Sequence, residues 1–195
     1  IVAGEPNTGK TTFCVDFSTK NMYQLARVEN GVTIPGIKYF TSEASAEEFL
    51  ELLDKYTDVP PEDFAKHVDV RKRKNTFADA IEPNAVNIVD YLVIHEDFYR
   101  VGIEISEIQD ALGSKGIVIV CLQKSPGAEL GRGGLGTEEL TRLYLSMEQK
   151  RDRVTHQRIP AVYTMRIVKA KHPMRKNLDP NGWYWEYKFK DGTSL

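Results

Sequence analysis

The chain has 195 residues, of which 41% are hydrophobic and 28% are charged, and its formal net charge is −2. These values are ordinary for one globular domain, and so small a charge gives the whole chain no attraction to nucleic acid. No apolar run approaches the roughly 18 residues of a membrane helix, so we expect no membrane partner.

The length predicts a single domain over residues 1–195. Because Ile1 lies inside what reads as a strand, we expect this domain to be excised from a longer chain. Cys14 and Cys121 lie far apart in apolar stretches and lack metal-ligand spacing. They are therefore predicted to be buried, reduced thiols, which favours a cytoplasmic location.

Strand and helix patterns alternate along most of the chain, which predicts an α/β fold with a mainly parallel sheet flanked by helices. The predicted elements are, in chain order, a strand over 1–3, a helix from Thr12, a strand over 37–41, a helix over 47–55, a strand over 67–70, a helical turn over 76–81, a buried strand over 86–94, a helix over 98–112 and a buried strand over 116–123. Strands over 143–147, 161–168 and 183–189 are separated by turns typical of a C-terminal antiparallel extension.

The most specific motif lies at the start of the chain. The residues Gly4-Glu5-Pro6-Asn7-Thr8-Gly9-Lys10-Thr11 match G-x-x-x-x-G-K-[ST], the phosphate-binding loop, between a predicted strand and a predicted helix. Backbone N–H groups and the helix N-terminus of such a loop surround a β-phosphate. Lys10 is expected to reach the β- and γ-phosphates and Thr11 to bind Mg²⁺, with Thr12 in the same site. The sequence therefore predicts a bound nucleoside triphosphate.

Three polar residues lie at or just beyond the ends of predicted strands, where doubly wound sheets bind their ligands. Asp90 is predicted to hold Mg²⁺, because a carboxylate in an apolar run is costly to bury unless it is paired or near a metal. Glu43 either activates the attacking water or only favours the start of the next helix, which Ser42 or Ser45 would cap. Gln123 either binds the γ-phosphate or satisfies a loop backbone.

Together, these motifs resemble those of RecA-fold ATPases of the DnaB-like helicase branch. The counterparts are the loop 4–11, then Phe40-Thr41-Ser42-Glu43, Val89-Asp90-Tyr91-Leu92 and the strand ending at Gln123. The stretch from Asp90 to Gly134 looks like the ATPase part of phage and mobile-element primase-helicases. The resemblance implies a RecA-like P-loop NTPase fold, ATP and Mg²⁺ as cofactors, and hydrolysis with Glu43 as the base. It also implies a role in DNA replication, as a homo-oligomeric ring or filament with ATP sites shared between subunits.

The resemblance implies two further sites. Lys169-Ala170-Lys171 matches a Lys-x-Arg pair that enters a neighbouring subunit's ATP site, although Lys replaces the Arg and Arg175 is a possible substitute. A solvated basic strand end is the alternative interpretation. The glycine-rich loop 127–136 matches a loop that contacts single-stranded DNA, and here it offers Arg132 but no aromatic stacking residue.

Three hypotheses remain open. The first is a motor ATPase acting on DNA, the second is a small-molecule phosphotransferase, and the third is a nucleotide-binding assembly or regulatory module with weak hydrolysis. The basic run 71–74 is either a phosphate-backbone contact or a solvated turn between a strand and a helix.

Overall fold

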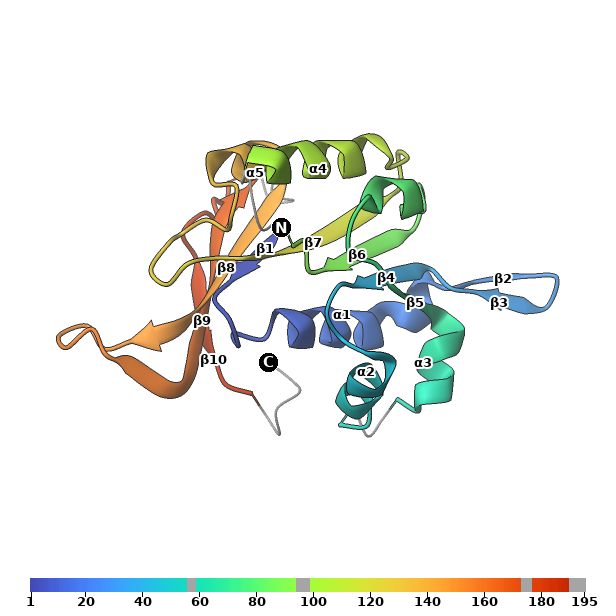
Figure 1. Cartoon of the computed structure of the whole chain (residues 1–195), viewed down its shortest axis with the longest axis horizontal. Helices are drawn as coiled ribbons and strands as arrows, with labels where there is room; N and C mark the ends of the chain where they lie inside the picture. Colours follow the sequence, from blue (N-terminus) through green and yellow to red (C-terminus); the bar gives the residue numbers. More distant parts are fainter. Residues whose placement is uncertain (56–58, 94–98, 173–176, 190–195) are drawn as a thin grey trace.

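The computed structural model describes residues 1–55, 59–93, 99–172 and 177–189 (Figure 1). Within these ranges, eight strands form one sheet in the order β10-β9-β8-β1-β7-β6-β4-β5. These strands are β1 (Val2–Gly4), β4 (Ile37–Thr41), β5 (Val68–Lys72), β6 (Val86–Asp90), β7 (Ile117–Gln123), β8 (Leu143–Arg151), β9 (Arg158–Ala170) and β10 (Tyr184–Tyr187). The helices are α1 (Lys10–Leu25), α2 (Ala46–Leu53), α3 (Pro61–His67), α4 (Tyr99–Asp110) and α5 (Leu135–Glu139), with a 3₁₀ turn η1 (Phe77–Ala80).

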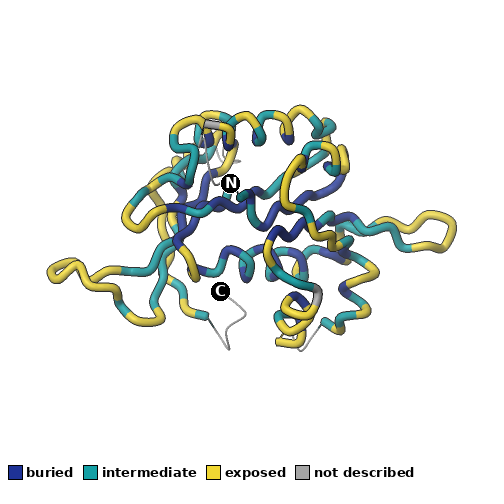
Figure 2. The backbone as a smooth tube through the Cα atoms, viewed as in Figure 1, coloured by how far each residue is buried: buried dark blue, intermediate teal, exposed yellow. Residues whose placement is uncertain are grey.

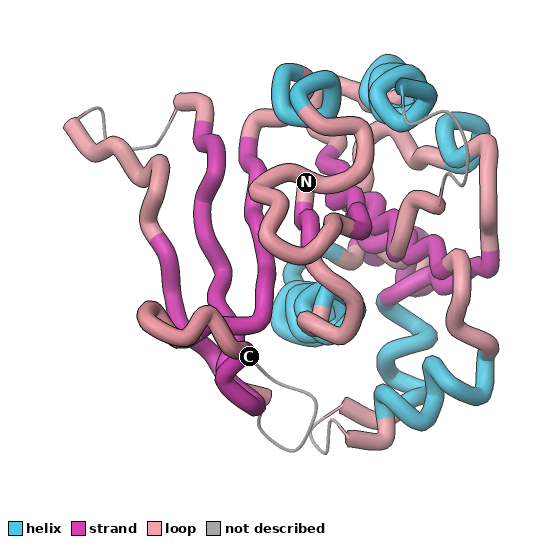
Figure 3. Tube along the Cα trace, turned by 60° about the vertical axis from the view of Figure 1, so that its left-hand side comes forward, coloured by secondary structure: helices cyan, strands magenta, loops and turns pink. Residues whose placement is uncertain are grey.

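The sheet has a parallel and an antiparallel part, as the sequence predicts. β8, β1, β7, β6, β4 and β5 run parallel to one another, whereas β9 runs antiparallel to β8 and β10 runs antiparallel to β9. The antiparallel strands lie at the end of the sheet away from α2 and α3 (Figures 1 and 3). All carboxyl ends of the parallel strands therefore lie at one edge, and β1 brings the glycine-rich loop to the middle of it.

Two hydrophobic cores cover the two faces of the sheet. Successive side chains of a strand point to opposite faces, so Tyr39 packs in one core and Phe40 in the other, and Ile88 and Val89 divide in the same way. The first core includes residues of α1, α2 and α3, and the second includes residues of α4 and η1. In Figure 2 the central strands are accordingly buried, while the tips of two hairpins are exposed. No helix in the described ranges is long and apolar enough to cross a bilayer.

The buried strand predicted over 86–94 is shorter in the structure. β6 ends at Asp90, and Tyr91 N–H donates to the Ser42 hydroxyl (3.1 Å) instead of continuing the ladder. Leu92 nevertheless packs in the second core. A run of apolar residues therefore did not distinguish the strand from the core-packed segment that follows it. Ile94 lies outside the described residues.

Other elements also differ from those predicted from the sequence. Pro61 begins α3, which ends at His67, so β5 starts one residue later than predicted and continues through Lys72 into the basic run. The hairpin of β2 (Arg27–Glu29) and β3 (Val32–Ile34) was not predicted, nor was α5 at the end of the glycine-rich loop. The prediction of buried, free Cys14 and Cys121 is confirmed.

Candidate active site

The glycine-rich loop connects β1 to α1, as the motif requires. Gly9 has φ 85°, a left-handed conformation that glycine adopts without strain. The Thr8 hydroxyl donates to the Glu5 carbonyl (2.9 Å). A Cβ on Gly4 would lie only 2.6 Å from this hydroxyl, so the position requires glycine. The chain therefore turns within a few residues and directs the N-terminus of α1 at the space above the loop.

Lys10 lies at the start of α1 and is buried. Its Nζ donates to the carbonyl oxygens of Gly4 (3.2 Å) and Glu5 (3.0 Å) and lies 5.8 Å from the centre of the Tyr91 ring. Burial lowers the pKa of Lys10, while the nearby charges of Asp90 and Glu43 oppose that shift. The ammonium group is therefore held inside the loop, where a phosphate would be bound.

Asp90 ends β6 beside the start of α1 and is only 5% exposed. Its Oδ2 accepts a hydrogen bond from the Tyr39 hydroxyl (2.7 Å), but its Oδ1 is buried without a hydrogen-bond partner among the described residues. Burial raises the pKa of Asp90, and the hydroxyls of Tyr39 and Thr11 and the charge of Lys10 oppose this. An unpaired buried carboxylate oxygen needs a partner, which a cation can provide.

The residues around Asp90 fit Mg²⁺. Asp90 offers a carboxylate and Thr11 a hydroxyl, and hard cations of this kind take oxygen ligands. No cluster of three or more His, Cys, Asp or Glu side chains suited to a metal occurs in the described part of the chain. A site of this type does not need one, because Mg²⁺ is commonly bound by one or two carboxylates together with substrate phosphates and water.

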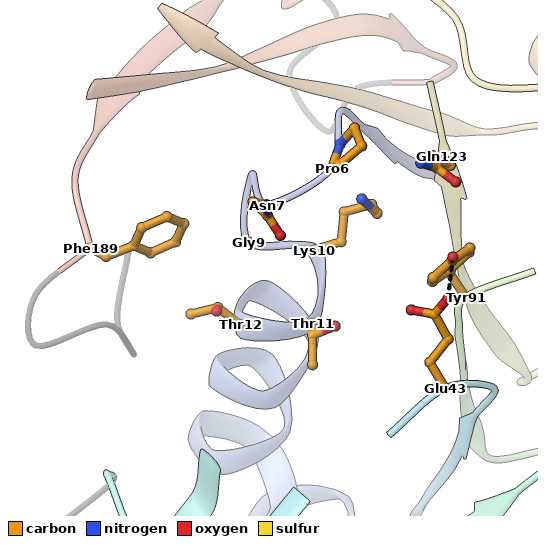
Figure 4. A pocket seen from close by; sticks show the side chains of 10 residues that line it. All are labelled: Pro6, Asn7, Gly9, Lys10, Thr11, Thr12, Glu43, Tyr91, Gln123 and Phe189. Carbon is orange, nitrogen blue, oxygen red and sulfur yellow. Dashed lines mark hydrogen bonds between the residues drawn. The ribbon is translucent and has the colours of Figure 1, made fainter. Parts of the chain in front are cut away.

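Glu43 follows β4 and projects toward the loop (Figure 4). The Tyr91 hydroxyl donates to its Oε1 (2.5 Å), and burial followed by this contact raises the pKa of Tyr91 to about 12. Ser45, rather than Ser42, caps α2, in a capping box with Glu48. Glu43 therefore lies before the helix, at the strand edge, and its carboxylate is oriented by Tyr91, a partner that the sequence analysis did not identify.

Gln123 ends β7 directly beside the loop, because it pairs with Gly4 in the sheet register. Its carbonyl accepts the backbone N–H of Arg132 (2.9 Å), which attaches the glycine-rich loop 127–136 to the site. The positive charge of Arg132 also acts to lower the pKa of Tyr91, against the rise caused by burial. The charge of Arg132 therefore acts on Tyr91, the residue whose hydroxyl is bonded to Glu43.

Lys10, Glu43, Tyr91 and Gln123 border one cavity of about 350 Å³ (Figure 4). It is lined by Pro6, Asn7, Gly9, Lys10, Thr11, Thr12, Glu43, Tyr91, Gln123 and Phe189. Asp90 borders a second cavity of about 390 Å³, which also includes Thr11, Glu43 and Tyr91 and extends along α2. The structure thus brings all four predicted groups, the loop, Glu43, Asp90 and Gln123, to one edge of the sheet.

Glu5 has a second role that the motif does not predict. It is 2% exposed, and its carboxylate accepts the backbone N–H of Gly127 (3.2 Å) and pairs with the guanidinium of Arg158 (3.1 Å). The phosphate loop is thereby joined to the glycine-rich loop and to β9. A variable position of the motif gives no sequence signal for such a contact.

Lys169 and Lys171 lie at the opposite edge of the sheet from the phosphate loop of the same chain. Ala170, between them, pairs with Leu143 at the start of β8, whereas Gly4 pairs with Met147 further along that strand. The lysine ammonium groups donate to the carbonyls of Glu138 (2.5 Å, from Lys169) and Glu139 (3.1 Å, from Lys171) at the end of α5. Arg175, the alternative residue, lies outside the described residues.

Comparison with known proteins identifies the fold. No family of known sequences matches the chain, and no curated protein matches it either. A RadB recombinase structure is similar over 99% of this chain and 89% of its own, with a TM-score of 0.63 at 12% identity. The KaiC-like protein PH0186 from Pyrococcus horikoshii OT3 is similar over 98% of this chain and 85% of its own, with a TM-score of 0.69 at 17% identity. The chain has the RecA-like P-loop fold.

Proposed function

We propose that this chain binds ATP with Mg²⁺ and hydrolyses it as a motor domain acting on DNA. The observation that carries the proposal is the convergence of Lys10, Glu43 and Gln123 on one cavity, with Asp90 beside Thr11 at its margin. These are the groups that phosphoryl transfer to water requires: a phosphate cradle, a metal-binding carboxylate and a base.

The residues divide the chemistry among themselves. The loop N–H groups and Lys10 bind the phosphates, and Asp90 and Thr11 would hold Mg²⁺, which when bound neutralises charge on the β- and γ-phosphates. Glu43 orients a water molecule and accepts its proton, while Tyr91 positions the Glu43 carboxylate through the 2.5 Å hydrogen bond. The Gln123 amide donates to the γ-phosphate.

The proposed link to DNA depends on the glycine-rich loop 127–136. Its Gly127 N–H contacts the Glu5 carboxylate and its Arg132 N–H contacts the Gln123 carbonyl, so the loop is attached to the nucleotide site at two points. A change at either point on hydrolysis would move the loop. The motif order, which resembles replicative helicases and primase-helicases, and a structural neighbour named as a recombinase favour DNA as the partner.

Replacing Glu43 tests the hydrolytic role. Glu43→Gln should bind Mg²⁺-ATP as tightly as the unaltered chain but release phosphate at least about 100-fold more slowly, because general base catalysis contributes about that much. Glu47→Gln, an exposed carboxylate in the first turn of α2, is the matched control and should keep full activity. Both should be measured with and without single-stranded DNA, which is expected to stimulate the unaltered chain.

Other outcomes of this assay would favour the other two functions. The second cavity, beyond Glu43 and Tyr91, is large enough for a small acceptor and supports a phosphotransferase as the alternative. Phosphate recovered on an added nucleoside or sugar instead of in solution would contradict hydrolysis. ATP binding without any turnover would favour a nucleotide-binding assembly or regulatory module.

A further inference from the structure

The nucleotide cavity has two chemically different ends. Glu43, Tyr91 and Gln123 border one end, and the aromatic ring of Phe189 borders the other, with the loop and the first turn of α1 between them (Figure 4). Phe189 follows β10, at the far end of the chain from the loop in sequence. If the γ-phosphate lies toward Glu43, the other end of the nucleotide extends toward Phe189.

Neighbouring rings hold the Phe189 ring in place. Its centroid lies 4.8 Å from that of Tyr163 on β9 and 5.9 Å from that of Tyr187 on β10, and the two tyrosine rings stack at 5.5 Å. Tyr163 and Tyr187 are direct partners in the sheet register. Aromatic contacts of this kind favour defined ring orientations.

The same cluster is bonded to the phosphate loop. The Tyr187 hydroxyl donates to the carbonyl of Thr8 (2.7 Å), within the loop that would bind the β-phosphate. This bond joins the aromatic cluster that contains Phe189 to the phosphate loop. A binding surface held in place before the ligand arrives loses little entropy on binding.

We propose that Phe189 is the stacking platform for the nucleobase of the bound nucleoside triphosphate. The inference rests on the proposed function, since it assigns the base end of the same site. A phenylalanine ring offers a face and no hydrogen-bonding edge, and stacking of this kind accepts any base. The site therefore takes nucleoside triphosphates with little discrimination among the bases, adenine and guanine included.

The test compares ATP, GTP and inorganic tripolyphosphate, each with Mg²⁺, by titration calorimetry. Phe189→Ala should weaken ATP and GTP about tenfold, the scale of one base–aromatic stack, and change tripolyphosphate affinity less than about twofold. Phe189→Trp should restore both nucleotides. Tyr184→Ala is the control: Tyr184 is 56% exposed and lies on the other face of β10, so its loss should change none of the three affinities.

Several results would overturn the platform. An equal loss of ATP and tripolyphosphate affinity in Phe189→Ala would indicate a distorted loop instead of a lost stack, and unchanged ATP affinity would show that the ring makes no contact with the base. More than about tenfold preference between ATP and GTP in the unaltered chain would contradict a base-blind site.

The same titrations separate this proposal from the proposed hydrolysis. Binding of tripolyphosphate as tight as that of ATP would reject the platform and leave the phosphate site intact. Binding of neither would reject the nucleotide site and the platform together. ATP binding that depends on Phe189, in a chain that hydrolyses nothing, would support the platform and reject the role of Glu43.

Discussion

At the scale of single residues, the site combines buried charge with incomplete pairing. Asp90 has one oxygen bonded to Tyr39 and one oxygen without a hydrogen-bond partner among the described residues, and burial raises its pKa. Such an arrangement costs stability in the empty protein and becomes favourable when a cation binds. Asp90 is thus better explained by ligand binding than by folding.

Asp90→Asn should separate stability from function. Because the folded-state pKa of Asp90 is raised, stability falls as the pH rises through the interval above its ordinary value of 3.8, and it stays lowered at pH 7. The Asn variant lacks this titration, so it should unfold at a higher temperature than the unaltered chain at pH 7. Its Mg²⁺-dependent phosphate release should fall at least about 100-fold.

Asp69→Asn is the matched control, with the opposite sign. Burial tends to raise the pKa of Asp69, but hydrogen bonds from Arg71 and Lys38 together outweigh it and leave the pKa below its ordinary value. The native partners therefore stabilise the fold above that value, and Asp69→Asn should lower the unfolding temperature at pH 7 while sparing hydrolysis. An Asp90→Asn chain that is less stable, or still active, would contradict this account. Thermal unfolding across pH and phosphate release measure both.

At the scale of elements, the sequence predicted what depends on local pattern. The alternation of β-branched strands and amphipathic helices predicted the parallel sheet, and the loop motif predicted the junction of β1 and α1. Glu43, Asp90 and Gln123 could be predicted because each lies at or just beyond a strand end. The end of β6 at Asp90 could not, because Leu92 continues the apolar pattern for a packing reason.

Contacts between elements distant in the chain had no sequence signal. The Tyr91 hydroxyl contacts Glu43 because β6 and β4 are paired in the sheet. The Arg158 guanidinium on Glu5 and the Phe189 ring beside the loop depend on how β9 and β10 lie against the phosphate loop. Residue type and spacing in a single sequence do not indicate which side chains from distant elements will be in contact.

Lys169 and Lys171 lie at the end of β9, away from the phosphate loop of their own chain, so any contact of theirs with a nucleotide would be with one bound to another copy. We propose a head-to-tail ring or filament in which these lysines complete the neighbour's site. The double Ala variant should bind ATP normally but release phosphate at least about tenfold more slowly. Circular dichroism should verify that α5, whose carbonyls these lysines contact, is retained.

Mixing variants tests the shared site directly. An equal mixture of the double lysine variant with Lys10→Ala should recover about a quarter of the unaltered turnover. That fraction follows because one interface in four then joins an intact loop to intact lysines. Activity equal to the sum of the separate variants would contradict a site shared between copies.

At the scale of the whole molecule, the order of the strands determines where the phosphate loop lies and which residues lie on each side of it. β1 lies between β8 and β7, so its loop opens at the middle of the edge where the parallel strands end. On one side lie β4 and β6 with the polar groups suited to hydrolysis, and on the other lie β9 and β10 with the aromatic cluster (Figure 1). A nucleotide bound in this cavity would therefore lie with its γ-phosphate toward β4 and β6 and its base toward β9 and β10.

A crystal structure of the chain with Mg²⁺ and a non-hydrolysable ATP analogue tests this account most directly. The predicted result is a triphosphate in the loop 4–11, with the γ-phosphate directed toward Glu43 and Gln123, the metal bound by Thr11 and Asp90, and the base against Phe189. A nucleotide bound elsewhere, or one whose γ-phosphate is directed toward Phe189, would contradict it.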